Sequence, residues 1–125
     1  MSKGPTQSIP YPARLQNFGR NSRRLSTAQP DVMTAFWGVH RAAVATGALD
    51  TKMKELIALA ISVALRCDDC IAHHTDDALK AGATEGEVAD ALGVAILMGG
   101  GASVVYATHA MEALDQFSAH GSPDS

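Results

Sequence analysis

The stretch ELIALAISVALRCDDCIAHHTDDALKAG, residues 55–82, decides most of what the sequence says about the fold. Its first half has apolar residues at helical spacing, which predicts a helix over residues 51–65 with Asp50 as its N-cap. A second helix should start within CDDC, residues 67–70, and end at Gly82, where a left-handed cap costs least. The stretch therefore predicts two helices joined by a short turn.

The flanking sequence continues the helical pattern. Apolar residues recur at helical spacing from Asp31 until Gly47, which is a good C-terminal stop. Thr84 and Glu87 can form a capping box that opens another helix, and glycines 99–101 interrupt it. No strand pattern occurs, so we expect an all-α fold. The further helices are expected over residues 31–47, from Thr84 to Met98, and over 103–118.

Charge divides the 125-residue chain into a basic arm and an acidic body. Residues 1–30 carry five basic residues and no acid, whereas the remainder carries five basic and thirteen acidic residues. The arm is expected to be extended over 1–12 with a short helical turn over 13–18. Since interleaved aromatic residues are missing, it should pack on an acidic surface of its own or a neighbouring subunit rather than bind nucleic acid. A single helical domain should span 31–118, followed by a frayed tail, 119–125.

No apolar run resembles a signal peptide, and no segment approaches the run of about 18 apolar residues that indicates a membrane span. We therefore expect a cytosolic protein that makes no membrane contact. Cytosolic thiols are kept reduced, so a close cysteine pair there is more often catalytic, redox-sensing or metal-binding than a permanent crosslink.

Cys67 and Cys70, the only two cysteines, are placed where thiols become reactive. A thiol attacks as the thiolate, and its ordinary pKa of about 8.5 is lowered at the start of a helix by the unpaired N–H groups and the dipole. His74 follows Cys70 by four residues, on the same helical face, where an imidazole can exchange a proton with that thiol. Cys67, Cys70 and His74 therefore share one stripe.

Glu55 is the candidate carboxylate to orient His74. If the two helices form an antiparallel hairpin that turns near Leu65 and Arg66, Glu55 comes level with about residue 75 and within reach of the imidazole. The order Glu55, His74, Cys70, Cys67 then becomes a proton relay. A neighbouring subunit could supply the acid instead.

The pattern E-x11-C-x2-C-x3-H, made by Glu55, Cys67, Cys70 and His74, resembles the signature of the AhpD-like alkylhydroperoxidases within the carboxymuconolactone decarboxylase superfamily. The similarity extends over residues 14–117. It implies an all-helical subunit that assembles as a trimer or hexamer, without metal or bound organic cofactor.

The resemblance also implies a role for each residue of the pattern. Cys70 would attack a hydroperoxide and become a sulfenic acid, and Cys67 would resolve it as a disulfide. His74 and Glu55 would relay the proton. An external dithiol, in the prototype a lipoyl-bearing partner, would then reduce the disulfide. The chain departs from the prototype at Asp69, where a histidine is replaced by a carboxylate that favours the protonated thiol and predicts a modest peroxidase rate.

Other functions fit parts of the pattern. The chain could be a decarboxylase acting on a lactone acid, a reaction that does not rely on the CxxC pair, or a non-enzymatic redox sensor or oligomeric binding module. The two cysteines could also be inert and buried, or could bind zinc with a histidine, although a second cysteine pair is absent.

Several remaining residues are expected to be structural. His73 should point away from the thiol stripe, and His40 should pack between helices beside Trp37. Asp76 and Asp77 should form a solvated face, while His109 and His120 have no motif around them. The methionines at helical apolar spacing are expected to fill the core: Met33, Met53, Met98 and Met111.

Overall fold

The computed structural model describes residues 9–120, and this part of the chain contains six helices and no strand. The all-α prediction is confirmed, and each central helix lies within a few residues of its expected position. None of these helices is long and apolar enough to cross a membrane. The helices are α1 (Tyr11–Ala28), α2 (Pro30–Val44), α3 (Thr51–Ala64), α4 (Asp68–Lys80), α5 (Glu85–Gly99) and α6 (Gly101–His120).

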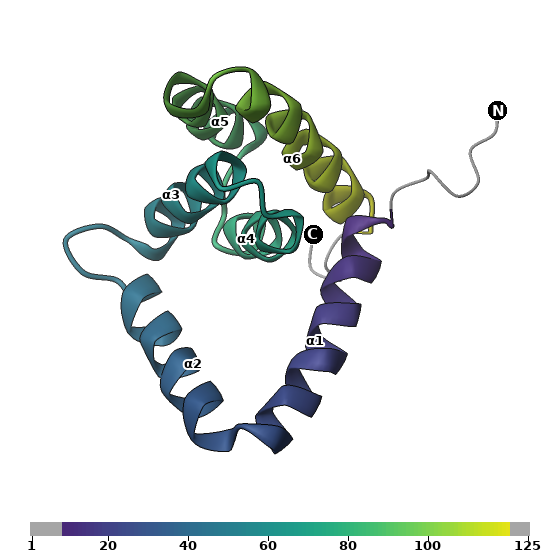
Figure 1. Cartoon of the computed structure of the whole chain (residues 1–125). Coiled ribbons are helices and arrows are strands. Elements are labelled where there is room, and N and C mark those ends of the chain that lie inside the picture. The colour runs from purple at the N-terminus through teal and green to yellow at the C-terminus, as the bar shows by residue number, and fades with distance from the viewer. Residues whose placement is uncertain (1–8, 121–125) are drawn as a thin grey trace, which may run out of the picture.

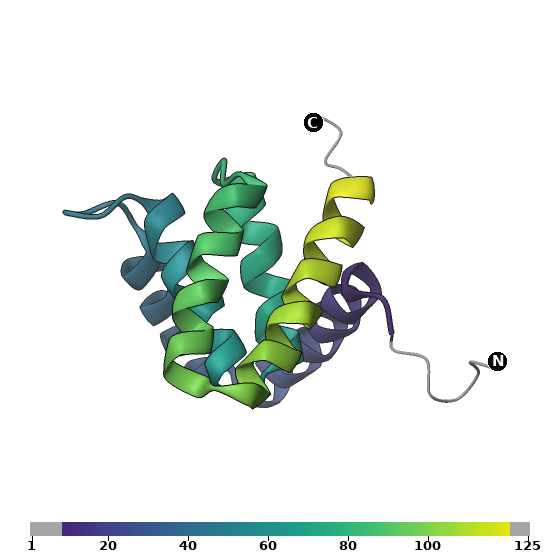
Figure 2. The same cartoon turned by 90° about the horizontal axis from the view of Figure 1, so that it is seen from above.

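The helices are arranged as a cluster with two arms. Helices α3, α4, α5 and α6 pack against one another, and α1 and α2 form an open V beside them (Figure 1). Helix α1 lies against α4 and α6, whereas α2 contacts α1 and the start of the cluster at α3. Seen from above, α6 and α5 run along one side of the cluster and α2 lies at the far side (Figure 2). The arms thus enclose one face of α4.

The core is made of aliphatic side chains and many alanines. Leu59, Val63, Ile71 and Val88 are fully buried. Burying one such side chain stabilises the fold by about 1.5–3 kcal/mol. The small side chain of alanine allows neighbouring helices to pack closely. The core alanines are Ala72, Ala78, Ala83, Ala95, Ala107, Ala110 and Ala113.

The predicted helix ends are present. Asp50 accepts a hydrogen bond from the Met53 N–H at 2.8 Å, and Thr84 and Glu87 make both bonds of the capping box. Gly82 adopts the left-handed conformation with φ of 97°. These local signals therefore position α3, α4 and α5 as the sequence indicated.

The glycine run separates α5 from α6. Gly100 has φ of 67° and ψ of −144°, a conformation that essentially only glycine adopts. A Cβ atom at Gly99 would clash with the buried side chain of Ser103. Gly100 therefore allows the chain to turn between α5 and α6, and Gly99 allows the side chain of Ser103 to lie against the backbone.

The expectation that residues 13–18 form only a short helical turn is wrong, because α1 is an 18-residue helix from Tyr11 to Ala28 that also takes in the last two residues of the segment expected to be extended. Pro12 lies in its first turn, where a missing N–H is harmless. The helix is stabilised by tertiary contacts that local patterns do not report, such as the burial of Tyr11. Residues 1–8 and 121–125 of the expected arm and tail lie outside the described residues, whereas Ala119 and His120 belong to α6.

Two of the four methionines that were expected in the core lie outside it. Met53 and Met98 are 44% and 76% exposed, so their assignment as core residues is wrong. Met33 is half-buried, and Met111 packs against the core. The apolar stripe expected over residues 51–65 is only partly buried, because Ile61 of α3 and Leu65, which directly follows α3, are exposed.

Candidate active site

The two cysteines lie at the turn from α3 into α4. Arg66 takes a left-handed φ of 60°, which reverses the chain, and Cys67 is the N-cap of α4. Its Sγ accepts a hydrogen bond from the Cys70 N–H at 3.2 Å. Cys67 and Cys70 are joined as a disulfide with Cα atoms 5.2 Å apart. The pair therefore lies at the positive end of a helix and can close into a disulfide within the native backbone.

Glu55 of α3 and His74 of α4 are in direct contact within one chain. His74 Nδ1 lies 2.7 Å from Glu55 Oε1, and Glu55 is only 2% exposed. An ionised carboxylate only accepts hydrogen bonds, so Nδ1 carries the proton and the neutral ring keeps a lone pair on Nε2. The predicted hairpin is confirmed, and Glu55 fixes the tautomer of His74.

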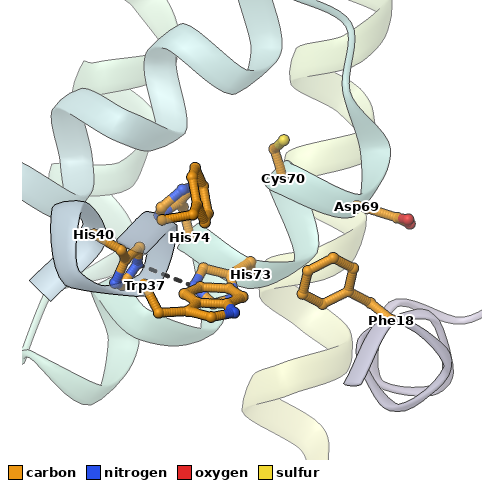
Figure 3. Close-up of a pocket in the computed structure, with 8 residues that line it drawn as sticks. Phe18, Trp37, His40, Asp69, Cys70, His73 and His74 are labelled. Atoms are coloured by element: carbon orange, nitrogen blue, oxygen red, sulfur yellow. Dashed lines mark hydrogen bonds between the residues drawn. The ribbon is translucent and has the colours of Figure 1, made fainter. Parts of the chain in front are cut away.

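A cavity of about 120 Å³ adjoins this cluster. Figure 3 shows side chains from three helices around it, with Phe18 from α1, Trp37 and His40 from α2, and Cys70 from α4. Its walls are largely aromatic. The complete lining is Phe18, Phe36, Trp37, His40, Asp69, Cys70, His73 and His74. Cys70 and His74 thus face one cavity, and Cys67 is not among its lining residues.

His73 also lines the cavity, so the expectation that it points away from the thiol stripe is wrong. It is three residues after Cys70, and α2 covers this side of α4. His73 Nε2 contacts His40 Nε2 at 3.3 Å, and the rings of His40 and Trp37 pack edge to face with centroids 5.4 Å apart. The interhelical position predicted for His40 is therefore confirmed.

The expected solvated face at Asp76 and Asp77 is wrong as well. Asp77 Oδ2 lies 3.1 Å from His73 Nε2, and its side chain is only 29% exposed. This hydrogen bond raises the pKa of His73, although burial of the ring opposes the rise. Asp76 pairs with Lys80 at 2.9 Å and is 19% exposed. Both acids are half-buried, and each pairs with a basic side chain one turn away on α4.

A second cluster at the start of α4 was missed by sequence reasoning. Asp68 Oδ1 accepts a hydrogen bond from the Tyr11 hydroxyl at 2.7 Å and also contacts His109 Nδ1 at 2.9 Å. Burial of the phenol, together with the Asp68 contact, raises the pKa of Tyr11 far above its ordinary value of 10.0. The cluster joins α1 and α6 to the CDDC turn. No motif surrounds these residues, so only their proximity in the fold identifies them.

The two aspartates between the cysteines both have partners. Asp69 Oδ1 lies 3.1 Å from an Arg14 guanidinium nitrogen, and Asp68 binds Tyr11 and His109. The positive charge of Arg14 offsets the repulsion that Asp69 would exert on a thiolate. The contact also shows that α1 packs on an acidic residue of its own subunit.

Two groups of side chains in the described part of the chain have the donor spacing for a metal ion. They are His40, His73 and Asp77, and Glu55, His74 and Asp77. Neither group includes a cysteine. The zinc site considered for Cys67, Cys70 and a histidine therefore has no counterpart among these groups.

The fold and site define an all-helical subunit with a cysteine pair at a helix start and, beside it, a histidine bonded to a buried glutamate. The family model "Carboxymuconolactone decarboxylase family" matches residues 30–113. The chain belongs to this family, and its expected superfamily is thereby confirmed.

Individual proteins agree with the family match. The chain is 42% identical over 106 residues to a Cupriavidus necator protein, H16_B0147, covering 85% of this chain and 94% of that one. Its structure resembles apo-lpg0406, a carboxymuconolactone decarboxylase family protein from Legionella pneumophila, with a TM-score of 0.84 and 39% identity. That match covers 86% of this chain and 96% of the other. A protein named alkyl hydroperoxide reductase Rv2159c from Mycobacterium tuberculosis is 32% identical over 87 residues, which are 68% of this chain and 25% of that protein.

Proposed function

We propose that the protein is a thiol-dependent hydroperoxidase, or a disulfide reductase, that works through the Cys67–Cys70 couple. The observation that carries this proposal is one cavity bordered by both Cys70 and His74, with His74 hydrogen-bonded to the buried Glu55. The relative named alkyl hydroperoxide reductase supports the same chemistry.

The chemistry begins with the reduced pair. His74 Nε2 takes the proton of the Cys70 thiol, and the resulting thiolate attacks the terminal oxygen of a hydroperoxide. The O–O bond breaks, and the alkoxide leaves as an alcohol after it takes this proton back from His74. Cys70 is then a sulfenic acid. Cys67 attacks the Cys70 sulfur, hydroxide leaves as water after protonation, and the disulfide forms. One hydroperoxide and two thiols thus give one alcohol, one water and one disulfide.

The position of each sulfur supports this division of roles. Cys70 lines the cavity, so a substrate reaches it first. Cys67 Sγ is the N-cap acceptor of α4, which favours its thiolate as an attacking and leaving group. An external dithiol, such as a lipoyl group on a carrier protein, would attack the Cys70 sulfur and release the Cys67 thiolate. A second exchange then restores both thiols.

We further infer a cytosolic homo-oligomer, as expected for the trimers or hexamers of similar proteins. Exposed large apolar side chains on α3, α5 and α6 and directly after α3 support this inference, because large exposed apolar patches mark interaction surfaces. They are Ile57, Ile61, Leu65, Val94, Leu97, Met98, Val104 and Val105, each at least 42% exposed.

Steady-state turnover of an organic hydroperoxide with a small dithiol donor tests the proposed function. Cys70→Ser should abolish turnover, and Cys67→Ser should leave a trapped sulfenate or mixed disulfide. Undiminished turnover in both variants would refute the proposal. A decarboxylation activity that survives thiol alkylation would instead favour a lactone-acid decarboxylase, and a disulfide that changes assembly without multiple turnovers would indicate a redox sensor.

A further inference from the structure

We propose that His40, His73 and Asp77 form a binding site for a divalent transition-metal ion of the Zn²⁺ type. His40 comes from α2, and the other two residues lie one turn apart on α4. His40 Nε2 and His73 Nε2 are 3.3 Å apart, and His73 Nε2 is 3.1 Å from Asp77 Oδ2. All three donor atoms lie within 4.8 Å of one another. Figure 3 shows the two imidazoles meeting beside the cavity.

The spacing of these atoms matches a tetrahedral ligand set. Zinc binds histidine nitrogen at about 2.0–2.1 Å, which places two tetrahedral ligands about 3.3–3.4 Å from each other. The two histidine nitrogens are already at this separation, and a carboxylate oxygen of Asp77 lies 3.1 Å from His73 Nε2 and within 4.8 Å of a ring nitrogen of His40. Two histidines and one carboxylate are a donor set that catalytic zinc sites use.

Proton counting also favours an ion at this position. Nε2 of His73 has either one hydrogen or one lone pair, yet it contacts both His40 Nε2 and Asp77 Oδ2. If His73 Nε2 donates its hydrogen to Asp77, no hydrogen and no lone pair of this nitrogen points to His40. The contact between the two histidines is then not a well-directed hydrogen bond. A cation would accept a lone pair from each of the three atoms and satisfy them together.

The other group with suitable spacing, Glu55, His74 and Asp77, is a poorer site. His74 Nδ1 and Glu55 Oε1 are 2.7 Å apart, which is a hydrogen-bond distance and shorter than the edge of a zinc tetrahedron. Binding there would have to break the pair that orients His74. We therefore assign the ion to the His40–His73–Asp77 group.

The site is independent of the redox state of the cysteines. It uses neither Cys67 nor Cys70, which are joined in a disulfide and have no thiolate to offer. His40 and His73 line the cavity, so an ion can reach them from that side. Binding is therefore expected in the oxidised protein.

The test titrates the chelator-treated, disulfide-bonded protein with Co²⁺, followed by visible absorption, and with Zn²⁺, followed by calorimetry. We expect one equivalent per chain and tetrahedral-type Co²⁺ absorption. Loss of even an outer partner of a metal ligand weakens binding about 10–100-fold, so His40→Gln, His73→Gln and Asp77→Asn should each weaken it at least about tenfold. His109→Gln, which alters an imidazole paired with a carboxylate at the other cluster, is the matched control and should bind like the parent protein.

The outcomes separate this site from its rivals. Absence of stoichiometric binding, or equal affinity in His40→Gln and the parent protein, would overturn the assignment. The assignment would also be overturned if Glu55→Gln lost metal binding while His40→Gln retained it, because the ion would then occupy the Glu55–His74–Asp77 group. His40 lies on α2, which has no buried residue, so folding of its variant needs a separate check. Circular dichroism should show that His40→Gln is folded, and the Zn²⁺-induced rise in Tm of the parent protein should be absent from this variant.

Discussion

Nδ1 of His74 and Oε1 of Glu55 lie 2.7 Å apart across the α3–α4 hairpin, with the carboxylate almost completely buried. A charged group in this position is tolerated because the imidazole N–H satisfies it. The contact fixes the ring so that Nε2 is left for proton exchange. The same contact holds the two helices of the hairpin in register.

Replacement of Glu55 by Gln should lower hydroperoxide turnover strongly. The amide keeps the size of the side chain but removes the charge that stabilises a protonated His74. General acid–base catalysis contributes about 10²–10⁴-fold to such rates, so kcat/KM should fall by at least about tenfold. Glu85→Gln, at an exposed glutamate in the first turn of α5, is the control and should be neutral. Equal kcat/KM in the two variants would remove Glu55 from the relay.

Stability should decline at alkaline pH because of Tyr11. Its pKa is raised by burial and by Asp68, so the folded protein keeps a neutral phenol above pH 10.0, where the unfolded chain ionises. Ionisation of the phenol then favours the unfolded state. The contribution of Tyr11 to stability is complete below the pKa of the phenol in the unfolded chain and is lost as the pH rises above it. Denaturant melts of the parent protein and Tyr11→Phe should show a shallower alkaline decline in the variant. The same slope in both proteins would contradict this assignment.

Gly100→Ala should destabilise the fold. Its φ of 67° and ψ of −144° suit glycine alone, and a side chain in such a conformation costs about 1–3 kcal/mol. Gly86→Ala is a matched control in a helical turn with room for a methyl group. This control should raise the free energy of unfolding by up to about 1 kcal/mol. Denaturant melts measure both changes, and a stabilising Gly100→Ala would contradict the structure.

Leu97→Glu should dissociate the oligomer without unfolding the subunit. Leu97 is 79% exposed in one chain, so a charge there costs little in the monomer but is unfavourable in an apolar interface. Leu25→Glu, on the exposed side of α1, is the control, since Leu25 is 49% exposed and lies outside the proposed interface. Sedimentation equilibrium measures the mass of each, and an unchanged mass for Leu97→Glu would remove this surface from the assembly.

The sequence predicts the hairpin and its site because their signals are local. Asp50 and Gly82 mark helix ends, and the spacing of Cys67, Cys70 and His74 is that of one helical face. The Glu55 contact follows once the turn is assumed. Each of these inferences needs only a few residues of neighbouring sequence.

Other features depend on contacts between distant segments. Tyr11 and Asp68 are 57 residues apart, and His40 and His73 are 33 apart, so no periodicity connects them. The length of α1 depends on the same tertiary packing. The exposure of Met98 was missed for a related reason, because apolar spacing identifies a face without saying whether one subunit or two cover it.

A single-turnover reaction tests the central claim most directly. Fully reduced protein is mixed with one equivalent of an organic hydroperoxide, and both free thiols and the alcohol product are counted over time. The account predicts that two thiols disappear and one alcohol forms for each chain, with no reaction after thiol alkylation. Thiols that persist while the peroxide is untouched, or alcohol that forms equally in the alkylated protein, would contradict it.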